Sequence, residues 1–230
     1  MYQDKLDLLL KKYAVVTPAV MTAADTVTIE NIEYPILSHR FERRITELRK
    51  MMHDGTLTGI SAIRCGHVAT EETSLDALIR RELDICRFLS GHEIVSVTAF
   101  IRDGRAATLI AVLDNQVVCS LEVANTLPKG ATVIDKHEVI SARGLICDRV
   151  VDTQIPQQSV YLYADTTEAY TDVDFELYGL TMSEVASIRA AFALAKDEAL
   201  REQVLTDAKV LDRLMNCVAL SAREGRKITV

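Results

Sequence analysis

The chain has 230 residues, which is enough for one large domain or two small ones with a buried core. Its 49% hydrophobic and 26% charged residues are typical of a globular protein. The formal net charge is -7, and Lys and Arg alternate with Asp and Glu. A phosphate-binding surface needs clustered positive charge, so we expect no nucleic-acid partner.

The five cysteines are widely separated and form no Cys-x-x-Cys pair, so their spacing suggests neither a disulfide framework nor a zinc site. The five histidines fall on different expected elements, never at metal-ligand spacing, and we expect them as isolated surface or capping residues. No apolar run approaches the length of a membrane span, and Met1 leads into a polar segment. We therefore expect a cytoplasmic protein without a bound metal and without a membrane partner.

Apolar periodicity divides the first part of the chain into helices and strands. Helices are predicted at residues 3 to 12, 39 to 54 and 74 to 90, and strands at 26 to 34 and 60 to 68. Gly55 and Gly91 are placed to end the second and third of these helices.

A rapid succession of strands follows. They are predicted at residues 93 to 102, 105 to 114, 116 to 125, 131 to 141, 144 to 151, 158 to 164 and 173 to 178. Such closely spaced strands predict an antiparallel meander. Thr181-Met-Ser-Glu184 is a capping box that begins a helix, and a last helix from about Thr206 precedes a short terminal strand.

Neither face of the strand at 105 to 114 is clearly polar, because Leu109 and Ile110 point to opposite sides. In the strand at 116 to 125, Leu121 belongs to the face that we expect to pack on helices, whereas Ser120 and Glu122 lie on an amphipathic second face. The fold class is therefore α+β, with a predominantly antiparallel open sheet and helices packed on one face. A moderately apolar open face is often used for a partner subunit, so we predict a homo-oligomer, most simply a dimer.

The helix at 74 to 90 carries an acidic residue within its apolar stripe, at Glu82. A buried carboxylate must be paired or protonated. We favour a structural ion pair with Arg64 or Arg102 over a catalytic acid. On the opposite stripe we expect a surface pair between Arg81 and Asp84, because these residues lie one turn apart.

The same helix resembles a helix of the Gfo/Idh/MocA oxidoreductases, which reads approximately Asp-x-Gly-x-His-x-x-Asp-x-x-Arg-Trp-Leu-x-Gly. The matching residues are Asp84, Arg87, Phe88, Leu89 and Gly91. In this register, Ala77 stands where the family has an active-site Asp, and Arg81 stands where it has a His. The resemblance extends over residues 35 to 230 and leaves residues 1 to 34 as a separate helix and strand segment.

Glycine placement indicates which half of such an enzyme is present. No glycine occurs before Gly55, so the chain lacks the Gly-rich fingerprint of a dinucleotide-binding fold, and it has no Glu-Lys-Pro element. The resemblance therefore implies the C-terminal, substrate and oligomerisation domain alone. We expect no cofactor in this chain and no catalytic residues.

A weaker inference concerns a ligand pocket. The guanidinium group of Arg81 could anchor a carboxylate or phosphate, and Glu82 could face a polar pocket. His39 and Arg40 resemble a segment that lies near the substrate region of the family. These four residues form our candidate pocket.

Two functional hypotheses follow. The first is a binding or oligomerisation module without catalysis of its own. The alternative is a subunit of a split NAD(P)-dependent sugar or polyol oxidoreductase, which a separate Rossmann-domain protein would complete. A neighbouring gene that encodes only a Rossmann domain would favour the alternative. A remnant without selected activity would have the same sequence features.

Overall fold

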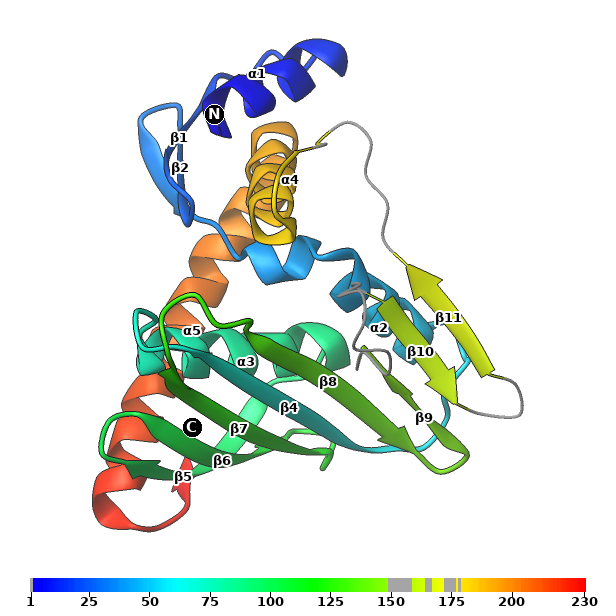
Figure 1. The fold of residues 1–230 in the computed structure, drawn as a ribbon, viewed down its shortest axis with the longest axis vertical. Helices are drawn as coiled ribbons and strands as arrows, with labels where there is room; N and C mark the ends of the chain where they lie inside the picture. Colours follow the sequence, from blue (N-terminus) through cyan, green and yellow to red (C-terminus); the bar gives the residue numbers. More distant parts are fainter. Residues whose placement is uncertain (1, 149–158, 164–166, 172–176, 178) are drawn as a thin grey trace. The chain divides into compact units, whose positions relative to one another are not determined.

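The computed structural model describes residues 2–148, 159–163, 167–171, 177 and 179–230 (Figure 1). Two compact units are present. Residues 1–43 and 173–210 form one, which we call the N-terminal unit, and residues 44–172 and 211–230 form the other, the sheet unit. The boundary that we placed between residues 34 and 35 stays a prediction. Among the described residues, no helix has the length and apolar character that crossing a bilayer requires.

The N-terminal unit combines helices with a three-stranded antiparallel sheet. Its elements are α1 (Tyr2–Lys12), β1 (Ala19–Ala23), β2 (Thr26–Ile29), β3 (Ile32–Pro35), the 3-10 helix η1 (Ser38–Phe41), α4 (Met182–Lys196) and the start of α5 (Glu198–Glu224). The single strand predicted at 26 to 34 is wrong. Glu30 and Asn31 have φ values of 53° and 66°, and this left-handed pair turns the chain into a hairpin.

Capping decides where the two C-terminal helices begin. Thr181 and Glu184 form the predicted capping box at the start of α4. The start predicted for the last helix, near Thr206, is wrong, because α5 already begins at Glu198. There the Asp197 carboxylate accepts a hydrogen bond of 3.2 Å from the Leu200 N–H group, which provides the cap.

The sheet unit contains nine strands in the order β11-β10-β9-β8-β4-β7-β6-β5-β12. They are β4 (Ile60–Thr70), β5 (Ile94–Arg102), β6 (Ala106–Leu113), β7 (Val118–Leu127), β8 (Ile134–Ser141), β9 (Gly144–Cys147), β10 (Ser159–Tyr163), β11 (Thr167–Thr171) and β12 (Ile228–Thr229). Every neighbouring pair is antiparallel except β4 with β7. The predicted α+β class is confirmed. The strand predicted at 173 to 178 falls largely outside the described residues.

The parallel pair arises because α3 (Leu75–Ser90) crosses the sheet between β4 and β5, and the hairpins β5-β6-β7 then return to β4. Helix α3 packs on β7, β6 and β4 (Figure 1). It ends at Gly91, as predicted, with φ at 71° and the glycine N–H group bonded to the Arg87 carbonyl. Beside α3 lies α2 (Arg43–His53), whose His53 ring contacts the Leu89 carbonyl oxygen at 2.9 Å.

The two faces of the sheet differ, as predicted for the strand at 116 to 125. Leu109 and Leu121 are fully buried on the helix side. On the other face, which we call the open face, Glu122 is exposed and Ser120 is half-buried. Alternation along β6 and β7 therefore separates a hydrophobic core from a surface that is partly polar.

Candidate functional site

A network of charged side chains is buried between the helices and the sheet, with Glu82 of α3 at its centre. The Glu82 side chain is 0% exposed. Its Oε1 atom lies 2.9 Å from Nδ1 of His67 on β4 and 2.5 Å from Nη1 of Arg81. Its Oε2 atom lies 2.9 Å from Nε2 of His137 on β8. Both carboxylate oxygens therefore have positively charged or N–H-donating partners.

His137 is held between two carboxylates. Its Nδ1 atom lies 2.7 Å from Oδ2 of Asp148, and its backbone N–H group donates to Asp148 as well. Ionised carboxylates only accept hydrogen bonds, so both ring nitrogens must carry protons. His137 is therefore an imidazolium cation. Nη1 of Arg44 donates to the same Asp148 carboxylate at 3.0 Å.

Asp135 lies on the side of the network that faces solvent. Nη2 of Arg81 lies 2.9 Å from Oδ2 of Asp135, and Arg44 forms a second ion pair with this oxygen. Three carboxylates thus face the cations Arg44, Arg81 and His137. The charges balance, which is the condition for keeping so many of them out of water.

These contacts lower the pKa values of Glu82 and Asp135 and raise the pKa of His137. Burial raises the pKa of Glu82, but Arg81 and His137 outweigh it and hold that pKa well below its ordinary value of 4.5. Burial likewise opposes the ionisation of Asp135, and Arg81 and Arg44 lower its pKa. Burial lowers the pKa of His137, whereas Asp148 and Glu82 raise it well above 6.5.

The position of β8 explains why the histidine prediction fails. Polar residues on both faces, such as His137 and Lys136, predict an edge strand here, but this prediction is wrong, because β8 pairs with β4 on one side and with β9 on the other. Because side chains alternate along β8, Asp135 and His137 both point toward the helices. Asp135 is the register partner of His67 on β4. His67 and His137 are buried rather than isolated at the surface, so that expectation is wrong for both.

Glu82 is a buried ion-pair member, but the partners that we named are wrong. Arg64 points to the open face, where it pairs with Glu138, and Arg102 pairs with Asp103. The cause is the alternation of β4, which turns His67 rather than Arg64 toward α3.

The surface pair predicted between Arg81 and Asp84 is also wrong. Asp84 is fully buried, and its Oδ1 atom lies 3.3 Å from Nη1 of Arg87. Arg81 instead binds Glu82 and Asp135. The balance of buried charges therefore outweighs the helical spacing from which the pair was predicted.

The four candidate pocket residues lie in different units. His39 and Arg40 belong to η1 of the N-terminal unit and are buried, and Nη1 of Arg40 lies 2.6 Å from Oδ2 of Asp207 in the same unit. Arg81 and Glu82 belong to the sheet unit. A pocket that combines all four stays a prediction.

Sequence reasoning missed His67, Asp135, His137, Asp148 and Arg44. One signal was available: the alternation of Asp135 and His137 along one strand places both on the same face. Their partners are distant in the sequence. Two groups of side chains have metal-ligating atoms within 4.8 Å of one another: His67 with Glu82 and Asp135, and Cys65 with Glu82 and His137. Because their members are far apart in the sequence, a search for metal-ligand spacing along the chain does not find them.

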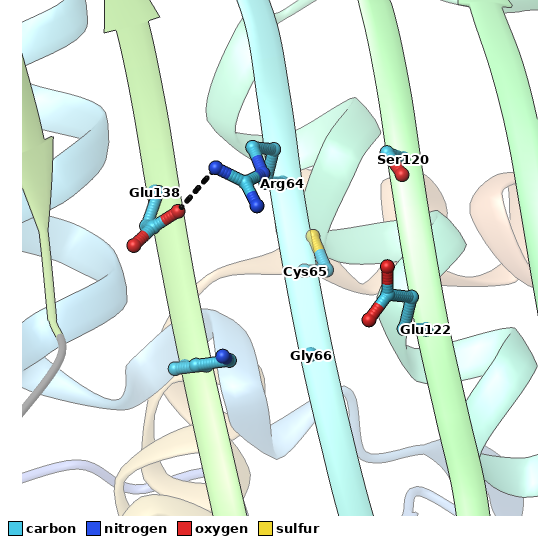
Figure 2. A pocket seen from close by; sticks show the side chains of 7 residues that line it. Arg64, Cys65, Gly66, Ser120, Glu122 and Glu138 are labelled. Carbon is cyan, nitrogen blue, oxygen red and sulfur yellow. Dashed lines mark ion pairs between the residues drawn. The ribbon is translucent and has the colours of Figure 1, made fainter.

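The open face carries a second polar cluster (Figure 2). Nη1 of Arg64 lies 3.2 Å from Oε2 of Glu138 across the β4-β8 pair. Gly66 has no side chain, which leaves a shallow hollow of about 30 Å³ beside Ser120 and Glu122. Figure 2 shows these polar groups on three neighbouring strands. The hollow is too small for an organic substrate.

Comparisons with known proteins identify the fold. Neither a protein-family model nor a curated protein sequence matches the chain. Among solved structures, the transcriptional regulator Gal80p from Kluyveromyces lactis is similar at a TM-score of 0.66 and 14% identity, over 85% of this chain and 62% of its own. An aldose-aldose oxidoreductase from Caulobacter crescentus is similar at a TM-score of 0.59 and 16% identity, over 84% and 62%.

An oxidoreductase domain protein from Kribbella flavida matches at a TM-score of 0.63 and 13% identity, over 84% of this chain and 65% of its own. The structural neighbours are of the Gfo/Idh/MocA type, and this chain spans only about 63% of their length. The resemblance inferred from the sequence is thereby confirmed at the level of fold, and the shares of the chains that are covered are consistent with a C-terminal domain only.

Glu82→Gln tests the structural role of the network. The substitution keeps the shape of the side chain but leaves His137 and Arg81 without their shared negative charge. We expect the free energy of unfolding to fall by about 3 to 5 kcal/mol, measured by urea denaturation. The matched control is Glu122→Gln on the open face, which should change it by less than about 0.5 kcal/mol. Equal midpoints for the two variants would contradict this role.

The pKa shifts also predict a pH dependence. Stabilisation from Glu82 is present above its unfolded pKa of 4.5 and is lost as the pH falls through the lowered folded pKa. Stabilisation from His137 is complete below its unfolded pKa of 6.5 and is lost as the pH rises through the raised folded pKa. The contribution of the network is therefore largest between pH 4.5 and 6.5.

Urea denaturation at a series of pH values from 4.5 to above 6.5 is the measurement. In the wild type, stability should decline above pH 6.5, and His137→Asn should remove this decline. His92→Asn is the control, because its ring is 42% exposed, and it should keep the wild-type slope. A wild-type stability that does not change above pH 6.5 would show that His137 is not held as a cation.

Proposed function

We propose that this chain is a binding and oligomerisation module that has the fold of an oxidoreductase C-terminal domain but no catalysis of its own. The proposal rests on the position of Arg81 in the family register and on the ion pairs that its side chain forms. In the register of the resemblance it stands where the family has a histidine, and its guanidinium group is engaged with Glu82 and Asp135. A guanidinium ion cannot act as a general base near neutral pH. Ala77, at the position of the family's Asp, has no polar group.

The fold is compatible with such a role. Its structural neighbours include oxidoreductases and also a protein described as a transcriptional regulator, Gal80p. A fold does not determine a function, and the chemistry of a site must supply it. In the sheet unit, each of the three carboxylates of the network faces cations.

The open face supports self-association. Across β8, β4 and β7, the strand register aligns Glu138 with Arg64 and then with Ser120. The next row aligns Lys136 with Gly66 and then with Glu122. The two rows present two positive and two negative side chains. A surface with both signs of charge is self-complementary when a two-fold axis places it against itself.

Apolar side chains surround these charges on the open face. Phe100 is 60% exposed, Ile134 51%, Val118 39% and Ile110 38%. The register of the sheet places Phe100 beside Thr108, which is the neighbour of Glu122. Exposed apolar side chains gathered on one face favour contact with another protein surface, and the proposed assembly is a homodimer.

None of the five cysteines, all of which lie within the described residues, forms a disulfide, and this supports a reducing compartment. Four of them are buried and one is half-buried. Structural disulfides belong to oxidising compartments, so we include a cytoplasmic location in this proposal.

A split oxidoreductase remains the second candidate. The structural neighbours are longer, and this chain spans about 63% of their length. A separately encoded Rossmann-domain protein could supply the remainder, together with the nucleotide site. Binding of such a protein, with the appearance of NAD(P)-dependent oxidation of a sugar or polyol, would favour this candidate over the module.

The self-association is tested by Glu122→Lys. This change makes the centre of the open face net positive and brings like charges together across a two-fold axis. We expect light scattering to give twice the chain mass of 25.5 kDa for the wild type and a mass near that of the monomer for the variant. Ser120→Lys should act in the same direction.

Asp76→Lys serves as the control, because Asp76 is an exposed residue on α3, on the helix side of the sheet. It makes the same change in net charge and should leave the mass of the wild type unchanged. A dimer that persists in both open-face variants would exclude this face as the interface. A monomeric wild type would exclude the homodimer altogether.

A further inference from the structure

One nitrogen of Arg81 lies among three atoms that commonly bind metal ions. Nη1 of Arg81 is 2.5 Å from Oε1 of Glu82, 3.2 Å from Nδ1 of His67 and 3.4 Å from Oδ1 of Asp135. These ligand-type atoms come from α3, β4 and β8 and lie within 4.8 Å of one another. The nitrogen therefore occupies a position that a metal ion could take.

The donor set suits a divalent transition-metal ion. Zn²⁺ accepts imidazole nitrogen and carboxylate oxygen at about 2.0 to 2.2 Å, and catalytic sites often supply three such ligands. Two atoms bound to one tetrahedral ion at these distances lie about 3.3 to 3.6 Å apart. An inward movement of the three side chains would close the site. Two carboxylates also neutralise the two charges of the ion.

The residues around this set already hold the ligands in place. His137 donates to Oε2 of Glu82, which leaves Oε1 directed at the Arg81 nitrogen. Arg44 binds Oδ2 of Asp135, and Oδ1 of Asp135 faces the same nitrogen. Such outer contacts orient metal ligands and raise the affinity of a site.

Access is possible from one side. The side chains of Arg81 and Asp135 are 17% and 16% exposed, while that of Glu82 is 0% exposed. Arg81 has a long flexible stem, and rotation toward solvent would uncover the three ligand atoms. The nitrogen that fills the site therefore belongs to a residue that can leave it.

We propose that His67, Glu82 and Asp135 form a binding site for a divalent transition-metal ion of the zinc class, and that the Arg81 side chain competes with the ion for this site. The inference goes beyond the proposed self-association and does not depend on it. Zn²⁺ binding displaces Nη1 of Arg81, and the arginine then acts as an internal competitor that weakens the affinity of the wild type.

The test is a titration with Co²⁺, whose visible absorption reports tetrahedral coordination, followed by displacement with Zn²⁺. All proteins carry Cys217→Ser, because Cys217 is the least buried of the free thiols and could bind the probe. Arg81→Ala should bind one Co²⁺ per chain. The parent with Arg81 should bind Co²⁺ on the order of 10 to 100 times more weakly than Arg81→Ala does. Adding His67→Ala to Arg81→Ala should lower the affinity for Co²⁺ by at least the same factor.

Four outcomes would overturn the proposal. A folded Arg81→Ala protein without stoichiometric binding shows that the set is not a site. Equal affinity of the parent and Arg81→Ala shows that the arginine does not compete. Binding that survives His67→Ala shows that the ion sits elsewhere. Should Arg81→Ala unfold in the presence of a chelator, Zn²⁺ is expected to restore its native circular dichroism, and failure to do so also overturns the proposal.

Discussion

The cost of burying the Glu82 carboxylate is the constraint on which the rest of the sheet unit depends. An isolated charge at 0% exposure would be strongly destabilising, so Glu82 must have cationic or hydrogen-bond-donating partners close by. His67 comes from β4 and His137 from β8, while Arg81 is the residue before Glu82 in α3. The demand for charge balance thus connects one helix to two strands of the sheet.

The same balance makes the network unsuitable for acid-base catalysis. A general acid or base works best with a pKa near the operating pH. In this network the pKa of Glu82 is lowered and the pKa of His137 is raised, so neither group changes its protonation near neutrality. Perturbed pKa values often mark active sites, but structural ion-pair networks produce them too. Because each charged group of this network is paired with an opposite charge, we interpret it as a structural ion-pair network rather than an active site.

Local sequence signals predicted a large part of the fold. The apolar stripe of α3 and its end at Gly91 follow from helical spacing and from the conformational freedom of glycine, and the capping box at Thr181 follows from a pattern of four residues. The buried face of β7 follows from alternation. Each of these features is decided by residues that are close together in the sequence.

The features that sequence reasoning missed depend on distant residues or on backbone geometry. His67 and His137 lie 15 and 55 positions from Glu82, and only the register of β4 with β8 brings them to it. The parallel pairing of β4 with β7 is a property of the crossover through α3. The hairpin at Glu30 and Asn31 required two left-handed residues that carry no glycine signal.

The resemblance in fold raises one question above the others, which is whether this chain works without a nucleotide site of its own. Titration calorimetry of the purified protein with NADH and NADPH answers it most directly. A module without catalysis of its own should give no heat of binding at millimolar nucleotide. Stoichiometric binding with a submillimolar dissociation constant would contradict this function and would place a dinucleotide site in a chain that has no glycine fingerprint for one.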